Sequence, residues 1–430
     1  MADESQCSWI YPEEPHMYPS SVAGGYIPLK IGQKLTTGPW DTEFTVLRKL
    51  GWGASGSVWL VHSEHYHFSA MKVLTAVESK ACSQQYRYEL EALTRLQQLK
   101  EDAAAQSKPL PLGSHYCIPS ISLFAVDSTH SGHWAILLPV CSSSLEKFIG
   151  DAMKKNIGFR FELNHIKRIV RQVSVGLHFF HATGMVHTDL KSSNLFIPLE
   201  GQYTSELSEY LHTHPALAYD PHVDLQISPE PIITFRSQTL PRIGPTSFDQ
   251  WHVCLGDYGE AVPVEKTHEL TSKGQDVMPA SMRAPEVTLH APWGQPIDIW
   301  ALGALAFELV TGDMGHIFDV SPVSGMNIDE IRLARIEELC GPFPKSSVLN
   351  APRGKSFFDS EGRLLKPLLG GTSSRGTLHQ RIELARPDWS KQDILETEGF
   401  LKRCLMIDPA VRPTVKELLD DQWYSHVAYH

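Results

Sequence analysis

With 430 residues, of which 42% are hydrophobic and 20% are charged, the chain is long enough for two or more compact units with ordinary hydrophobic cores. Its 49 acidic residues outnumber 38 basic ones, and the net charge of −11 argues against nucleic-acid binding as the main activity. The seven cysteines are scattered and never spaced C-x-x-C, which favours reduced thiols inside a cell over a disulfide framework or a zinc site.

The first part of the chain is predicted to be rich in strands. Residues 1–40, rich in Pro, Tyr, Gly and Ser, predict an irregular arm. Strand-like runs follow at 44–50, 57–62 and 68–74. Leucines that recur three residues apart then predict a helix over 84–99, and the polar segment 101–114 predicts a loop.

The second part is predicted to be mainly helical. Amphipathic stretches run over 163–182, 298–311, 328–340 and 391–406. Residues 199–250, rich in Pro, Ser, Thr and His, have little periodicity and predict an insertion or linker. Strands followed by helices indicate an α+β architecture with two lobes. We therefore expect an arm at 1–40, an N-lobe at 41–141 and a C-lobe at 142–430 that contains the insertion.

A glycine-rich turn lies between the first two predicted strands. Gly51, Gly53 and Gly56 form the pattern G-x-G-x-x-G-x-V, in which missing side chains let the backbone approach triphosphate oxygens. A plain hairpin turn explains this pattern alone about as well. A dinucleotide site is disfavoured, because a strand rather than a helix follows Gly56.

The third predicted strand contains Lys72 in Ala-Met-Lys-Val, and a lysine among apolar residues points inward only if it has an anionic partner. Glu89 is the candidate partner, because it shares a helical stripe with Leu93 and Leu96. The alternative for both charges is a solvated helix face. Glu91 lies off this stripe and is expected to be solvated.

Two motifs indicate phosphoryl transfer from ATP to an alcohol. His187 to Asn194 has the order His-x-Asp-x-Lys-x-x-Asn, and Asp257 opens an Asp-Tyr-Gly triplet. Asp189 is predicted to orient the substrate hydroxyl and accept its proton, and Lys191 to contact the γ-phosphate. Asn194 and Asp257 are the predicted Mg²⁺ ligands. A polar loop would explain any one of these positions but not this order.

The adenine ring has candidate contacts in Val58, Ala70 and Phe196, for which ordinary core packing is an equally good explanation. The full predicted nucleotide set is Leu50, Gly51, Gly53, Gly56, Val58, Ala70, Lys72, Phe196 and Asp257. Further along, Arg412 is predicted to pair with Glu286 of an Ala-Pro-Glu motif as a structural lock. The histidines at 62, 65 and 67 are interpreted as strand-turn residues, and His178 and His181 as packing or capping residues.

From about residue 25 to 425 the chain resembles eukaryotic protein kinases, and within them the SR-protein kinases, which phosphorylate serines of arginine-serine-rich splicing factors. The closer likeness is carried by Gly24–Gly32, Leu47–Gly53, His187–Asp189 and the position of the insertion. The resemblance implies a two-lobed kinase fold, with one main helix in a small β-rich N-lobe and a larger helical C-lobe. It also implies ATP and Mg²⁺ as cofactors and a basic protein substrate. We expect a monomer that binds no nucleic acid directly.

The chain departs from the kinase pattern at several positions. Thr188 replaces the arginine that usually receives an activation-loop phosphate, which predicts activity without loop phosphorylation. The other departures are Ser192–Ser193, Pro279, Met282 and two arginines, Arg332 and Arg335, in a stretch where the resembled family is acidic. These departures concern the predicted arginine-serine-rich substrate more than the predicted phosphoryl transfer.

Two other functions stay open. One is a serine/threonine kinase with different targets, such as those of cyclin-dependent or MAP-kinase relatives. The other is a nucleotide-binding pseudokinase scaffold, which is disfavoured because Lys72, Asp189, Asn194 and Asp257 are all present. The N-terminus lacks a signal-peptide core, and the apolar segment 301–310 is too short to span a bilayer. We expect a soluble cytoplasmic protein without membrane contact, and leave a nuclear fraction open.

Overall fold

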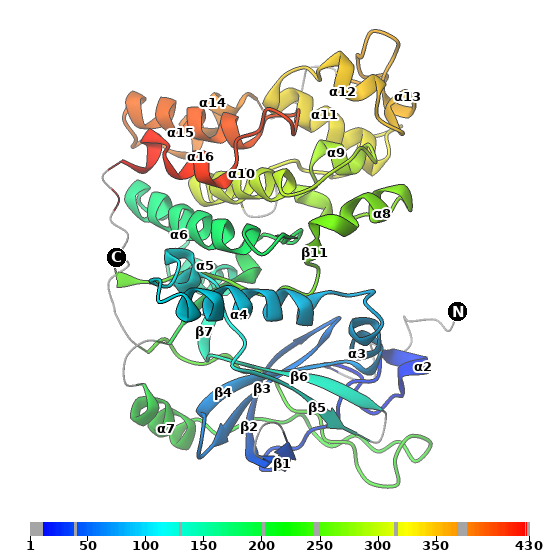
Figure 1. Ribbon diagram of the computed structural model, residues 1–430, viewed down its shortest axis with the longest axis vertical. Coiled ribbons are helices and arrows are strands. Elements are labelled where there is room, and N and C mark those ends of the chain that lie inside the picture. Colours follow the sequence, from blue (N-terminus) through cyan, green and yellow to red (C-terminus); the bar gives the residue numbers. More distant parts are fainter. Residues whose placement is uncertain are drawn as a thin grey trace. The chain divides into compact units, whose positions relative to one another are not determined.

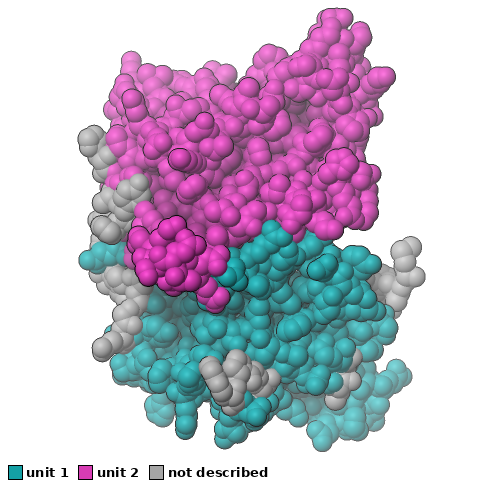
Figure 2. All heavy atoms as spheres, in the orientation of Figure 1, with its two compact units in different colours: residues 1–98, 118–144, 196–251 teal, residues 99–117, 145–195, 252–430 magenta. Residues whose placement is uncertain are grey.

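The computed structural model describes residues 12–37, 41–128, 131–199, 203–243, 250–313, 317–368, 376–425 and 427. It divides into two compact units (Figure 2). Unit 1 comprises residues 1–98, 118–144 and 196–251, and unit 2 comprises residues 99–117, 145–195 and 252–430. The insertion expected at 199–250 therefore groups with unit 1, whereas the sequence placed it within the C-lobe. The expected domain limits stay a prediction.

Unit 1 is built on a six-stranded sheet of order β1-β2-β3-β4-β6-β5, in which all neighbours are antiparallel (Figure 1). Its strands are β1 (Lys34–Thr37), β2 (Thr42–Gly53), β3 (Gly56–Ser63), β4 (His67–Leu74), β5 (Ser122–Asp127) and β6 (Gly132–Leu138). The three strands expected at 44–50, 57–62 and 68–74 are confirmed as β2, β3 and β4. A shorter strand, β7 (Cys141–Ser144), pairs with β9 (Leu195–Pro198).

Both faces of this sheet are buried, because successive strand residues point to opposite sides and both sets are apolar. Trp59 and Val61 of β3 lie on one face, where Ile27 and Leu29 of the N-terminal arm pack. The opposite face carries a second cluster made by the sheet and the insertion: Leu60, Phe68, Val140, Leu199, Leu207, Leu240 and Ile243. The arm and the insertion thus complete the core of unit 1.

The helices of unit 1 differ from those expected. The helix expected over 84–99 corresponds to α4 (Glu89–Ala105), which begins and ends later than expected, and the division between the units falls within it. A separate helix before it, α3 (Ala76–Ser83), was not predicted. The expected irregular segments also contain regular elements, namely β1 and α2 (Ser20–Ala23) in the arm and α7 (Thr204–Thr213) in the insertion. Packing of α7 on the sheet stabilises it, and local periodicity carries no record of such tertiary contacts.

Unit 2 is mainly helical. Its larger helices are α5 (Leu145–Lys155), α6 (Leu163–His181), α10 (Pro296–Thr311), α11 (Ile328–Cys340), α14 (Leu378–Ala385) and α15 (Lys391–Cys404). Its short helices are α8 (Thr267–Ser272), α9 (Pro285–Thr288), α12 (Lys345–Leu349), α13 (Gly354–Phe357) and α16 (Val415–Leu419). Its short strands are β8 (Met185–Val186), β10 (Cys254–Leu255) and β11 (Val262–Pro263). The four helices expected in this half are confirmed as α6, α10, α11 and α15.

Helix α10 forms the centre of unit 2, where it contacts α6, α14 and α15 (Figure 1). Nearly every residue of α10 is buried, because the helix is apolar on all sides. A strand-rich unit and a helix-rich unit confirm the predicted α+β class. No helix within the described ranges is long and apolar enough to cross a membrane.

Candidate active site

The glycine-rich turn of unit 1 closes the β2–β3 hairpin, where Gly53 pairs with Gly56. Its three glycines have different surroundings. A Cβ on Gly56 would lie 2.3 Å from the carbonyl oxygen of Val73, so only glycine fits there. A Cβ on Gly51 or Gly53 would meet nothing within 4 Å. The backbone at these two positions is open to a ligand, as phosphate binding through N–H groups requires.

Lys72 and Glu89 form a buried ion pair in unit 1. The lysine Nζ lies 2.6 Å from a carboxylate oxygen of Glu89, and the two residues are only 8% and 4% exposed. The predicted contact is confirmed, while the predicted role in binding nucleotide stays a prediction. Glu91, on the other side of α4, pairs with Arg95 at 2.6 Å near the surface. The helical stripe therefore distinguished the inward carboxylate from the outward one.

Three predicted nucleotide contacts lie on the same face of the sheet as Lys72. Val58 is paired directly with Lys72 across β3 and β4, and Ala70 is two residues before Lys72. Leu50 packs against the cluster that holds Leu60, which shares this face. Val58 and Leu50 are only half-buried, so neither is committed entirely to the core. Adenine contact stays a prediction at these positions.

The catalytic stretch of unit 2 brings three predicted residues together. The amide nitrogen of Asn194 donates to both the backbone oxygen and the carboxylate of Asp189, each at 2.8 Å. Lys191 Nζ lies 2.9 Å from the same carboxylate. Asn194 lies in η3 (Ser192–Asn194), a single turn that brings its side chain back toward Asp189. Asp189 is thus fixed by one amide and faces one ammonium group.

Asp257 follows a backbone segment that is bonded to the catalytic stretch. The Gly256 N–H donates to the carbonyl of Asn194 at 3.0 Å, and its carbonyl lies 3.2 Å from Nε2 of His187. Nδ1 of His187 accepts from the N–H of Asp189 at 3.3 Å, so Nε2 carries the proton. Asp257 itself is exposed and has a φ of 54°. The buried imidazole of His187 therefore links both motifs.

Tyr258, the aromatic residue of the Asp-Tyr-Gly triplet, fixes this segment from inside. It is 2% exposed, stacks on Phe180 with ring centres 5.1 Å apart, and donates to the carbonyl of Leu255 at 2.9 Å. Burial raises the pKa of its phenol well above the ordinary value. A neutral, hydrogen-bonded ring leaves the neighbouring Asp257 facing outward.

Sequence reasoning missed the residue that holds the catalytic loop. Asp298 is fully buried, and its carboxylate accepts from the backbone N–H groups of His187 at 2.7 Å and Thr188 at 2.9 Å. His181 Nε2 lies 2.8 Å from the same carboxylate. Thr188 has a left-handed φ of 64°, which a β-branched residue rarely adopts without such support. The available signal was an acid in the first turn of a predominantly apolar helix.

The predicted structural lock is present in unit 2. Arg412 binds both carboxylate oxygens of Glu286, at 2.7 and 3.2 Å, and both side chains are almost fully buried. This bidentate contact confirms the predicted pair. Nearby, Nε of Arg332 donates to the carbonyl of Ala280 at 2.8 Å, in the turn that contains Met282 and follows Pro279. The segment that precedes Glu286 is thus also fixed.

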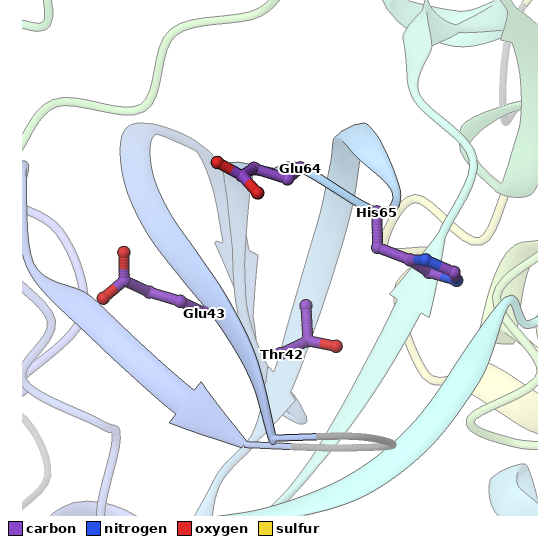
Figure 3. A pocket seen from close by; sticks show the side chains of 4 residues that line it. All are labelled: Thr42, Glu43, Glu64 and His65. Atoms are coloured by element: carbon purple, nitrogen blue, oxygen red, sulfur yellow. The ribbon is translucent and has the colours of Figure 1, made fainter.

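A surface hollow of about 630 Å³ lies elsewhere on unit 1 (Figure 3). Its lining side chains are Thr42, Glu43, Glu64 and His65. Glu43 is bound to Lys34 at 2.7 Å and both are well exposed. None of the predicted site residues lines this hollow. The ring of His62 contacts those of His67 and Phe68, in agreement with its interpretation as a strand-turn residue.

The residues present suit a hard divalent cation and a triphosphate. Asn194 uses its amide nitrogen on Asp189, which leaves its carbonyl oxygen for another partner. Asp257 supplies an exposed carboxylate. Such oxygen donors are the ligands that Mg²⁺ prefers. Within unit 1, the open glycine positions and the buried ammonium of Lys72 suit phosphate oxygens.

Residues 246–424 match the protein kinase domain. Over its length the chain is 24% identical to serine/threonine-protein kinase SRPK of Physarum polycephalum, covering 94% of this chain and 90% of that protein. It is 24% identical to serine/threonine-protein kinase spk-1 of Caenorhabditis elegans, and the match covers 94% of this chain and 50% of that protein. Dual specificity protein kinase CLK1 of Homo sapiens is also 24% identical, with 90% and 66% covered. The chain thus spans half of the C. elegans protein.

These similarities point to a protein kinase. Over most of its length the chain is similar to serine/threonine protein kinases named SRPK and CLK, and its strand-rich and helix-rich units agree with the α+β fold of a protein kinase domain. A protein kinase domain implies a protein substrate and the use of ATP, typically with Mg²⁺. The span that matches the kinase domain model contains Asp257, Glu286, Asp298 and Arg412. The glycine-rich turn and the stretch around Asp189 lie outside that span, but the similarity to the SRPK relative includes them.

Proposed function

We propose that this kinase transfers the γ-phosphoryl group of ATP to serine hydroxyls in arginine-serine-rich proteins. The observation that carries the chemistry is the Asp189 carboxylate, held by Asn194 and facing Lys191 within 2.9 Å. The similarity to kinases named SRPK supports the substrate class. The net charge of −11 also suits a basic partner.

In the proposed reaction the serine oxygen forms a bond to the γ-phosphorus as the bond to the bridging oxygen of ADP breaks. Asp189 orients the hydroxyl and accepts its proton. Lys191 places positive charge beside the developing charge of the phosphoryl group. Asn194 fixes the Asp189 side chain and, with Asp257, would hold Mg²⁺. When bound, Mg²⁺ neutralises phosphate oxygens.

On unit 1, Lys72 binds phosphate oxygens and Glu89 holds its ammonium group in place. The N–H groups of the turn from Gly51 to Gly56 contact the triphosphate. Val58, Ala70, Leu50 and Phe196 contact the adenine ring.

A kinase with a different protein substrate is favoured by one observation on α11. Arg332 is buried and bound to Asp329 at 2.6 Å, and Arg353 binds the same carboxylate at 2.8 Å. Arg335 is bound to Glu338 at 3.0 Å. These internal pairs neutralise acidic groups that would otherwise attract a basic peptide.

The chemistry is tested by Asp189→Asn, which keeps the shape of the side chain but removes the proton acceptor. We expect kcat to fall by roughly 10²-fold to 10⁴-fold, the usual contribution of general-base catalysis, while ATP still binds. Radiolabel transfer measures kcat, and calorimetry measures the binding of ATP. Asp220→Asn, at an exposed position of the insertion, is the control and should behave as wild type. If Asp189→Asn kept the turnover of the wild type, the proposed mechanism would be wrong and this motif would have no role in the reaction.

The substrate class is tested with two peptides, an arginine-serine repeat and a proline-directed serine peptide, at saturating ATP. We expect kcat/KM to be at least tenfold higher for the repeat. Equal values, or a preference for the proline-directed peptide, would remove the arginine-serine assignment and leave the kinase chemistry intact. Absence of transfer to any peptide, together with tight ATP binding, would favour the pseudokinase alternative.

A further inference from the structure

The N-terminal arm touches the glycine-rich turn through Tyr26. The Tyr26 hydroxyl donates to the carbonyl of Gly53 at 2.9 Å. Its ring meets that of Trp52 edge to face, with centres 6.2 Å apart and planes at 82°. Tyr26 is 7% exposed, whereas Trp52 is 45% exposed. The turn is thus attached to a buried side chain from a segment that precedes the first strand.

The segment that carries Tyr26 is itself fixed to α3. The N–H of Ala76 donates to the carbonyl of Gly25 at 2.9 Å, and that of Val77 to the carbonyl of Gly24 at 3.2 Å. Both glycines have left-handed φ values, 75° and 73°. A Cβ on Gly25 would lie 3.0 Å from the backbone of Ser20 and 3.1 Å from the Cβ of Ala76, the first residue of α3. Only glycine at this position permits the chain to approach α3 so closely.

The far side of the turn is held by the same helix. The N–H of Thr75 donates to the carbonyl of Ser55 at 2.9 Å, and the Thr75 hydroxyl caps α3 by accepting from the N–H of Glu78. Two carbonyls of the turn, at Gly53 and Ser55, are therefore bound to one small scaffold made by the arm and α3. A carbonyl that is held in this way is not available to face an anion.

We propose that Tyr26 is a positioning residue for the nucleotide triphosphate: its hydroxyl holds the Gly53 carbonyl so that the turn presents N–H groups, rather than an oxygen, to the phosphates. The inference rests on the proposed function, in which this turn contacts phosphate oxygens. Without the hydroxyl, the Gly53 carbonyl loses one of the contacts that orient it, and the peptide after Gly53 rotates more easily, because glycine restricts the backbone little. Rotation brings a carbonyl dipole toward the negative charge and removes a donor.

The hydroxyl is suited to a permanent role. Burial raises the pKa of Tyr26 to about 12, and the carboxylates of Glu14 and Glu78 add to the shift. The group therefore keeps the proton that it donates throughout the pH range of a kinase assay. The effect of removing it should accordingly be the same at about pH 6.5 and about pH 8.5, both of which lie well below this pKa.

The test is Tyr26→Phe, which removes the hydroxyl and keeps the ring against Trp52. Binding of Mg–ATP and of adenosine is measured by calorimetry, together with KM and kcat. We expect ATP affinity to fall by roughly 3-fold to 10-fold, the effect of one neutral hydrogen bond. Adenosine affinity, kcat at saturating ATP and the peptide KM should be unchanged. Tyr86→Phe, at a position that is 75% exposed in the same unit, is the control.

The outcomes separate the alternatives. Equal losses for ATP and adenosine would mean that Tyr26 only supports the fold, and unchanged ATP affinity would mean that the hydrogen bond does not position the turn. Either result overturns the inference but leaves the proposed function standing. If the wild-type protein instead bound ATP no more tightly than adenosine, the turn would not bind phosphate. The nucleotide site of the proposed function would then be wrong.

Discussion

The catalytic loop at His187–Asn194 and the strand that leads into the glycine-rich turn are supported by different parts of the chain. The catalytic loop is held from within unit 2, by the buried carboxylate of Asp298 and by the contact between Thr188 and Glu260. The strand β2 is held by segments that come before and after the sheet in the sequence. The catalytic loop is thus supported by groups that contact its own motif, whereas β2 is supported by two additions to the kinase motifs, the N-terminal arm and the insertion.

The additions meet at Lys49, the residue two before Gly51. Lys49 is 1% exposed, and its ammonium group binds Glu13 at 2.8 Å and also Glu14. Glu13 in turn accepts from the backbone N–H and the hydroxyl of Ser237 in the insertion, each at 2.6 Å. The arm, the strand and the insertion are thus joined through one buried charge cluster. We therefore expect that changes in the arm or the insertion alter the stability of unit 1 and leave that of the catalytic loop unchanged.

The largest expected effect is that of Lys49→Met, which leaves two buried carboxylates without their cation. Loss of one partner from a buried ion pair costs about 3–5 kcal/mol. We expect fast hydrogen exchange over 42–53 and unchanged exchange over 187–194, measured by mass spectrometry. The variant with Glu13→Gln and Glu14→Gln added to Lys49→Met should recover much of the loss. Equal acceleration in both segments would break the comparison.

The cost of Lys49→Met should also depend on pH. Burial raises the pKa of Glu14, against the opposing effect of Lys49, and loss of the lysine raises it further. A raised carboxyl pKa means that the folded state binds more protons, so the variant gains stability as pH falls through that pKa. The difference in unfolding free energy between wild type and variant should therefore shrink on acidification. A difference that grew on acidification would contradict a charge-based origin.

The second effect in size is that of Asp298→Asn, on the other side of the comparison. The amide replaces a charged acceptor of two backbone N–H groups, and hydrogen bonds to charged groups contribute about 1.5–3 kcal/mol each. We expect kcat to fall by roughly 100-fold or more, with little change in ATP affinity. Asp420→Asn, at an exposed position, is the control. Loss of ATP affinity with unchanged kcat would mean that Asp298 does not act through the catalytic loop.

These supports also mark the limit of what the sequence predicted. Lys72, Asp189 and Asn194 were recognisable because phosphoryl transfer needs fixed residue types at short, fixed spacings. Glu89 was found from a helical stripe, which is also a local pattern. Tyr26 and Asp298 instead act on Gly53 and His187, which lie 27 and 111 residues away in the chain. Such contacts depend on tertiary packing, which periodicity and composition do not encode.

The same reason explains the errors in the fold. Strands β2, β3 and β4 and helices α6, α10, α11 and α15 carry their own hydrophobic pattern, and these were predicted, whereas strands β5 and β6 were not. The insertion and the arm bury their apolar residues against the sheet, so their short elements α7 and β1 depend on a partner surface for stability. Segments of this kind resemble loops when they are considered alone.

The smallest expected effect concerns Thr188, whose hydroxyl donates to the carbonyl of Glu260 at 2.7 Å. This neutral contact joins the catalytic loop to the segment after Asp257, where most regulated kinases use an arginine and an activation-loop phosphate. Thr188→Val keeps the β-branched shape and removes the hydroxyl, at a cost of about 0.5–1.5 kcal/mol. We expect kcat to fall by a corresponding factor of roughly 2 to 12, whereas Thr188→Ser, which keeps the donor, should stay near wild type.

Phosphatase treatment completes this test, because a neutral contact needs no phosphate. Wild-type activity should survive the treatment, and the loss in Thr188→Val should be the same before and after it. If the treatment abolished wild-type activity, the link from Thr188 to Glu260 would be insufficient and the predicted independence from phosphorylation would be wrong. If Thr188→Val and Thr188→Ser were equally active, the shape of the residue at its left-handed φ of 64°, rather than its hydroxyl, would support the loop. Asp298, and not the hydroxyl of Thr188, would then be the main polar support of the first part of the catalytic loop, and the contrast with the charge cluster around Lys49 would become sharper.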